Sequence, residues 1–156
     1  KPSLDRIISF KAKKNNERFS AKKEASVHIT GNWETVFNAD NKVDSYIAKG
    51  IFNQKGAKVT GTFRTISGDY RYLEGIMDGD SLKLSTFDGA HAFLFTAKAT
   101  DSTLNGFFYS DNHWKEPFTA KLNNTYELPK EENLTVIKKG YEYFDFSFPE
   151  LSVSYH

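Results

Sequence analysis

The sequence contains no cysteine among its 156 residues, and it has only one methionine, two tryptophans and four prolines. Without cysteine the chain forms no disulfide of its own and offers no thiolate as a metal ligand or nucleophile. No apolar run approaches the roughly 18 residues of a membrane-spanning helix, and no signal peptide is visible, so we expect no transmembrane segment. Because the chain begins at Lys1 and not at methionine, we expect a processed or trimmed piece of a longer protein.

The chain also lacks an excess of charge of either sign. The 21 lysines and arginines nearly balance the 20 aspartates and glutamates, which gives a net charge of +1, so we expect no nucleic-acid partner. We interpret the one basic cluster, near the N-terminus, as a solvated strand or arm and not as a binding patch. The cluster consists of Lys11, Lys13, Lys14, Arg18, Lys22 and Lys23.

Aromatic residues are abundant instead, at 15% of the chain, with 14 phenylalanines and eight tyrosines. This composition favours β-sheet over a helical bundle. Apolar and polar residues alternate through most of the middle of the chain, which predicts eight strands between residues 29 and 122. The fourth, residues 70–77, is the least clear because both of its faces carry bulky side chains. We place turns at residues 39–42, 53–56, 67–69, 78–80, 88–90, 100–102 and 110–113.

Eight strands joined by short loops predict an all-β fold, an eight-stranded up-and-down antiparallel calycin-like barrel. Closing the sheet removes its unpaired edges. The predicted inward rows mix glycine and alanine with large rings such as Trp33, Phe63 and Phe93, as a narrow interior requires. Such a barrel is either filled by its own side chains or holds one small ligand.

We divide the chain into an N-terminal arm (residues 1–25), the barrel (26–123) and a C-terminal region (124–156). The arm includes a predicted strand near residues 7–13. The C-terminal region begins a short helix at Pro129 that reaches about Lys139 and stops at Gly140. An extended connector then runs through "YEYFDFSFPEL", residues 141–151.

Alternate turns of a meander lie at the same end of a barrel, so the turns at Asp40, Asp69, Asp88 and Asp111 share one mouth. We expect a cluster of ionisable and aromatic side chains there, with Arg71 and His91 able to bind an anion or carboxylate. The cluster comprises Asp69, Arg71, Asp88, His91, His113 and Trp114.

A plainer interpretation of this mouth cluster is turn chemistry, which we favour. Aspartate before glycine caps the backbone of a hairpin, as in "FDGAH", and Arg71 beside Asp88 suits a cross-strand ion pair. The possible metal ligands of the cluster match no metal motif, so we expect neither a metal nor another cofactor. No catalytic motif occurs elsewhere, and we assign no catalytic residue.

Two stretches resemble the calycins, the class of small barrels that includes lipocalins and avidins. "GNWETVF" (31–37) carries their Gly-x-Trp, and "KVTGTF" (58–63) is similar to an avidin-like third strand. The resemblance implies that Trp33 plugs a closed end and that the mouth with Asp69 and Asp88 is the open end.

A broader resemblance covers residues 8 to 151. "GNWETVF", "GIFNQKGAKVTGTFRTISGDYRYLEG", "STFDGAHAFLFTA" and "YEYFDFSFPEL" are together similar to a region of TlpA-like thiol–disulfide oxidoreductases from Bacteroidetes-type cell envelopes. The region is the non-catalytic barrel before the thioredoxin fold. These proteins are often labelled peroxiredoxin or AhpC/TSA family. The resemblance implies an exported, periplasmic or envelope protein with a thioredoxin-like domain following residue 156, and a protein redox partner or small ligand.

The chemistry of that family resides in a Cys-x-x-Cys pair, and this chain has no cysteine. Its last residues, "SVSYH", also depart from the family pattern. We therefore expect an accessory barrel domain that positions a redox domain or docks a partner. The alternatives are a free-standing calycin-like binder of a small apolar or anionic molecule, with an interior pocket lined by Trp33, Phe63 and Phe93, and an enzyme acting through Asp88 and His91.

Overall fold

The computed structural model describes residue 14, residues 18–130, Leu134, and residues 139 and 140. Its nine strands are all antiparallel, and the described residues include no helix. They are β1 (Gly31–Phe37), β2 (Tyr46–Lys55), β3 (Lys58–Thr65), β4 (Gly68–Asp69), β5 (Leu73–Asp78), β6 (Ser81–Phe87), β7 (Ala92–Ala99), β8 (Thr103–Ser110) and β9 (Trp114–Leu122).

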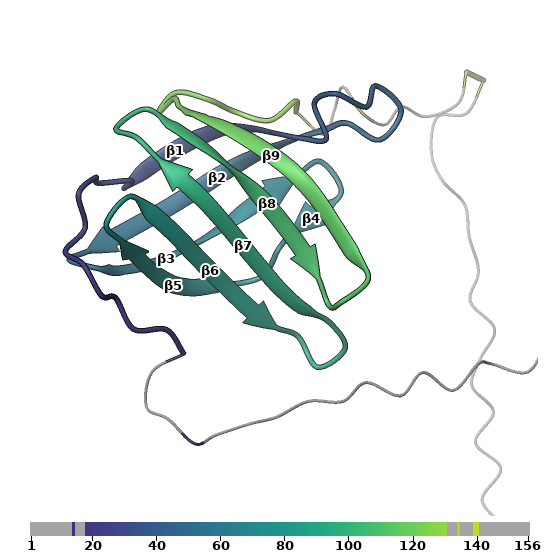
Figure 1. Ribbon diagram of the computed structural model, residues 1–156. Coiled ribbons are helices and arrows are strands. Elements are labelled where there is room, and N and C mark those ends of the chain that lie inside the picture. Colours follow the sequence, from purple (N-terminus) through teal and green to yellow (C-terminus); the bar gives the residue numbers. More distant parts are fainter. Residues whose placement is uncertain (1–13, 15–17, 131–133, 135–138, 141–156) are drawn as a thin grey trace, which may run out of the picture.

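Eight of these strands close into a barrel (Figure 1). Each of the eight pairs with the strands before and after it in the ring. β3 pairs with β5, because β4 is not a member of the ring, and β1 closes the ring by pairing with β9. The predicted eight-stranded antiparallel barrel is therefore confirmed. The predicted N-terminal strand at residues 7–13, the connector at 141–151 and most of the predicted C-terminal helix lie outside the described residues. The described residues hold no helix long and apolar enough to cross a membrane.

The turn predicted at residues 53–56 is wrong, because β2 continues to Lys55 and the chain turns at Gly56 and Ala57. Gln54 explains the longer strand. Its amide is buried, where it accepts a hydrogen bond from the Ile29 N–H at 2.9 Å and donates one to the Val27 carbonyl at 3.1 Å. The polar side chain that suggests a turn in the sequence instead anchors the chain leading into β1.

The predicted fourth strand, residues 70–77, is shorter in the structure, and residues 68 and 69 of the predicted turn at 67–69 form a strand instead. The tiny β4 pairs with the end of β3, and β5 begins only at Leu73. Between them Arg71 has a positive φ of 60°, and its N–H donates to Asp69 Oδ1 at 2.9 Å. The hydrogen-bonded aspartate offsets part of the cost of this left-handed conformation.

The barrel interior is filled with aromatic rings. Phe63 is fully buried, and its ring centroid lies 5.5 Å from Phe37, 5.2 Å from Phe52 and 4.9 Å from Phe95. Of the rings predicted to point inward, Trp33 and Phe63 are fully buried and Phe93 is partly buried. Gly106 is needed for the close packing of β7 and β8, because an added Cβ would lie 1.9 Å from the Thr96 carbonyl oxygen.

The described part of the N-terminal arm, from residue 18, runs along the end of the barrel opposite the mouth. Both backbone N–H groups and a charged side chain bind this part of the arm to the barrel. The N–H groups of Lys22 and Lys23 both donate to Asp78 Oδ1, and these bonds lower the pKa of that carboxyl. Arg18 donates to the carbonyl oxygen of Ser85 at 2.8 Å.

Candidate functional site

The loops at residues 38–45, 66–67, 88–91 and 111–113 lie at one end of the barrel, as the strand pairing requires (Figure 1). This is the predicted mouth. The sequence therefore placed the six members of the mouth cluster at the correct end of the fold. How they contact one another is a separate matter, because each side chain has its own local partners.

Asp88 and His91 form a capped hairpin. Asp88 Oδ1 accepts hydrogen bonds from the backbone N–H groups of Ala90, at 2.9 Å, and His91, at 2.7 Å. These two bonds are the main reason that the pKa of Asp88 falls to about 2. The His91 ring lies farther away, with Nδ1 3.4 Å from Asp88 Oδ2. A carboxyl with so low a pKa is a weak base near neutral pH, which favours the turn over a catalytic pair.

Arg71 does not form the predicted cross-strand ion pair with Asp88 among the contacts of the described residues. The left-handed backbone at Arg71 interrupts the wall, so the regular pairing of β5 with β6 starts at Glu74 and Ser85. Asp69 is occupied by the Arg71 N–H and not by the guanidinium. Asp69 and Arg71 are thus neighbours through the backbone, and their side chains are both exposed.

The last two members of the mouth cluster, His113 and Trp114, lie at the end of the loop between β8 and β9 and at the start of β9. His113 Nδ1 is 4.0 Å from Asp111 Oδ2, while Asp111 Oδ1 accepts a hydrogen bond from the Ala92 N–H at 2.9 Å. Trp114 begins β9 with half of its surface exposed. Within the part of the chain that the structure describes, no three histidine or carboxylate side chains are arranged to hold a metal ion.

A polar cluster that the sequence did not predict lies inside the same end of the barrel. Glu116 on β9 is only 4% exposed. The hydroxyl of Tyr46 on β2 donates to Glu116 Oε1, and Asn38 Nδ2 donates to Glu116 Oε2 at 2.6 Å. The Tyr46 and Tyr70 hydroxyls are 2.6 Å apart. This buried cluster of Asn38, Tyr46, Tyr70 and Glu116 joins the end of β1, β2, the break after β4, and β9.

Burial raises the pKa of both Tyr46 and Tyr70, and the hydrogen bond to Glu116 raises that of Tyr46 further. Both phenols therefore stay protonated well into the alkaline range. Both oxygens of Glu116 accept a hydrogen bond, one from Tyr46 and one from Asn38. The hydrogen bonds of the buried cluster join β2 to β9 within an apolar interior.

The signal for this buried cluster was present in the sequence. Glu116 is two residues before the buried Phe118, and Tyr46 is two residues before Ala48. Extending both inward rows by one step toward the mouth would have placed a carboxylate and a phenol inside the barrel.

The described pockets do not coincide with the predicted ligand cavity. The interior rings contact one another instead. One pocket of about 850 Å³ lies beside residues 21–28 at the end opposite the mouth. Another, of about 520 Å³, follows strands β6 to β9. Trp33 itself is fully buried near the end away from the mouth, where its Nε1 donates to the Ile29 carbonyl at 2.9 Å.

Comparison with protein-family models and with curated proteins gives no match to this chain. A function is therefore proposed from the fold, the geometry of the mouth and the resemblance of the sequence.

Proposed function

We propose that the barrel is a non-catalytic accessory domain of an exported thioredoxin-like thiol–disulfide oxidoreductase, and that its mouth docks the redox domain of the same protein. The observation that carries the docking role is an apolar rim. Five large hydrophobic side chains are exposed in or next to the loops of this end: Val43, Ile66, Tyr72, Phe87 and Trp114.

Exposed apolar side chains gathered at one end of a barrel are typical of a protein interface. Tryptophan and tyrosine are also the residues that contribute most to such interfaces. Inside the rim, the ionisable groups are engaged in local structure: Asp88 caps a hairpin, and Glu116 is held by Tyr46 and Asn38. A surface of this kind is better suited to docking a protein domain than to catalysing a reaction. The redox identity of the docked domain rests on the resemblance of the sequence.

The first test is the intact mass and complete reading frame of the native protein. We expect a longer product that carries a Cys-x-x-Cys domain after residue 156. A native product that ends at His156 would remove the redox proposal, and a screen of small apolar and anionic ligands would then address the alternative of a free-standing binder.

The docking role has a separate test in the complete native protein. Tyr72→Ser with Trp114→Ser should release the second domain and increase the radius of gyration in small-angle X-ray scattering. Phe107→Ser is the matched control, because Phe107 is an exposed ring on the wall of β8 and not at the mouth. Equal radii for the rim variant and the control would exclude the rim as the docking surface.

A further inference from the structure

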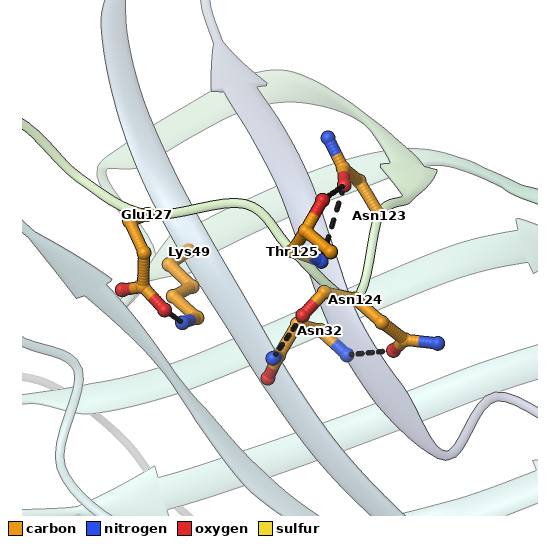
Figure 2. A network of polar contacts seen from close by, with 6 residues as sticks. All are labelled: Asn32, Lys49, Asn123, Asn124, Thr125 and Glu127. Carbon is orange, nitrogen blue, oxygen red and sulfur yellow. Dashed lines mark hydrogen bonds and ion pairs between the residues drawn. The ribbon is translucent and has the colours of Figure 1, made fainter.

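A short segment after β9 folds back over the outside of the barrel. Residues 123–128, here called the strap, cover the outer face of β1 and β2 (Figure 2). The Asn123 N–H donates to the Asn32 carbonyl at 2.9 Å, and Asn32 bonds Asn124 twice, at 3.0 Å each. The strap thus continues the pairing of β1 beyond the end of β9.

The beginning of the strap is a compact turn built by its own side chains. Asn123 Oδ1 accepts hydrogen bonds from the N–H and the hydroxyl of Thr125, and the Asn123 carbonyl accepts one from the Tyr126 N–H at 3.0 Å. Gly31 leaves room for it, since an added Cβ would lie 2.6 Å from Asn124 Oδ1. The turn is therefore stabilised by its own hydrogen bonds and packs closely against the start of β1.

In the described part of the chain, an ion pair joins the far end of the strap to β2. Lys49 Nζ lies 2.6 Å from Glu127 Oε1. The Lys49 side chain is only 8% exposed although it points away from the barrel interior, whereas the Glu127 side chain is 73% exposed. A lysine that is covered on an outer wall depends on its partner, because an unpaired charge there would be poorly solvated.

A second carboxylate lies beside this lysine. Glu34 on β1 is directly opposite Lys49 on β2 in the strand register. Side chains at opposite positions of an antiparallel pair are close enough to form an ion pair. In the structure Glu34 instead accepts a hydrogen bond from Asn123 Nδ2 at 3.2 Å, while Lys49 is bonded to Glu127. The strap therefore occupies both members of a potential cross-strand pair.

We propose that the strap is a latch with two alternative sets of contacts. In the closed set, seen here, Asn123 binds Glu34 and Glu127 binds Lys49. In the open set the strap leaves the wall, and Glu34 and Lys49 pair with each other across the strands. The new pair offsets part of the lost contacts, which lowers the cost of opening. Opening exposes the outer face of β1 and β2.

Amide hydrogen exchange by NMR on this chain tests the latch. The reporters are the Asn32 and Asn123 amides, whose hydrogen bonds join the strap to β1, and the Thr35 amide in the middle of β1 reports global unfolding. Glu127→Gln should accelerate exchange of the reporters between about threefold and tenfold, without a matching change at Thr35. Glu34→Gln should slow the reporters, and adding it to Glu127→Gln should return the rates toward those of the unmodified protein.

Acylation of lysine amines gives a second measurement. Lys49 should react slowly in the unmodified protein and faster in Glu127→Gln, while the exposed Lys58 should react equally in both. Unchanged reporters in Glu127→Gln would overturn the latch, as would parallel acceleration at Thr35. Faster exchange in Glu34→Gln would overturn the alternative pairing, because Glu34 would then stabilise only the closed state. These outcomes require no partner, so they are independent of the docking test.

Discussion

The hydroxyl of Tyr46 donates a hydrogen bond to the carboxylate of Glu116, a residue 70 positions later in the chain and buried in the barrel. The two residues lie on β2 and β9, the strands on either side of β1. The bond therefore ties the first and last parts of the barrel wall together inside the mouth.

Removing the Tyr46 hydroxyl tests this tie. Tyr46→Phe leaves the ring in place but deprives Glu116 Oε1 and the Tyr70 hydroxyl of their shared partner. We expect the free energy of unfolding, measured by urea denaturation, to fall by about 1–3 kcal/mol. Tyr72→Phe is the matched control, because Tyr72 is 67% exposed, and it should change stability by less than about 0.5 kcal/mol.

The same buried cluster predicts how stability depends on alkaline pH. The pKa values of Tyr46 and Tyr70 in the folded protein are raised above the ordinary value of 10.0. The folded state therefore holds these protons more tightly than the unfolded state. Their contribution is complete below pH 10 and is lost progressively as the pH rises above it. Tyr46→Phe should flatten this dependence in unfolding curves recorded from pH 8 to 11, and an unchanged slope would contradict the assignment.

Asp88 predicts the opposite behaviour in acid. Its pKa is lowered from 3.8 to about 2 by the Ala90 and His91 N–H groups, so its contribution is present above pH 3.8 and fades as the pH falls toward 2. Asp88→Asn should reduce this acid dependence. His91→Ala keeps the capping N–H and should leave it nearly intact. A large effect of His91→Ala would mean that the imidazole, and not the hairpin backbone, is the main partner of Asp88.

Gly106 predicts a steric limit in the wall. A Cβ at this position would lie 1.9 Å from the Thr96 carbonyl oxygen and 2.7 Å from the Ala97 side chain. Gly106→Ala should therefore lower the free energy of unfolding by about 1–3 kcal/mol, as thermal or urea denaturation can measure. Asn105→Ala, at the exposed neighbouring position on β8, should be nearly neutral. Equal stability of both variants would show that β7 and β8 separate easily.

The sequence was sufficient for the fold because the alternation of apolar residues fixes which face of each strand is buried. It failed where one residue has two possible roles. Gln54 belongs to a sequence typical of a turn, yet its amide is buried and bonded to Ile29 and Val27. Tyr70 and Tyr72 alternate with Arg71 and Leu73, which made both faces of the predicted fourth strand bulky, and in the structure the regular strand begins only after the left-handed Arg71.

The candidate site was predictable only in part. Counting turns places Asp88, His91 and His113 at one end, since that depends on topology alone. Which atoms meet depends on the backbone within each loop, and there the aspartates accept main-chain N–H groups in place of the predicted arginine. The partnership of Tyr46 with Glu116 depends on β2 and β9 both flanking β1, which no local pattern contains.

The pairing of β1 with β9 has a consequence for synthesis. Trp33 on β1 lies opposite Leu122 on β9. One edge of β1 therefore has no partner until β9 has left the ribosome. At about 5–20 residues per second, that wait is on the order of ten seconds. During this time the nascent protein presents an open sheet edge and the unburied rings of Phe37 and Phe63, which makes the emerging chain a substrate for holding chaperones and a hazard for aggregation.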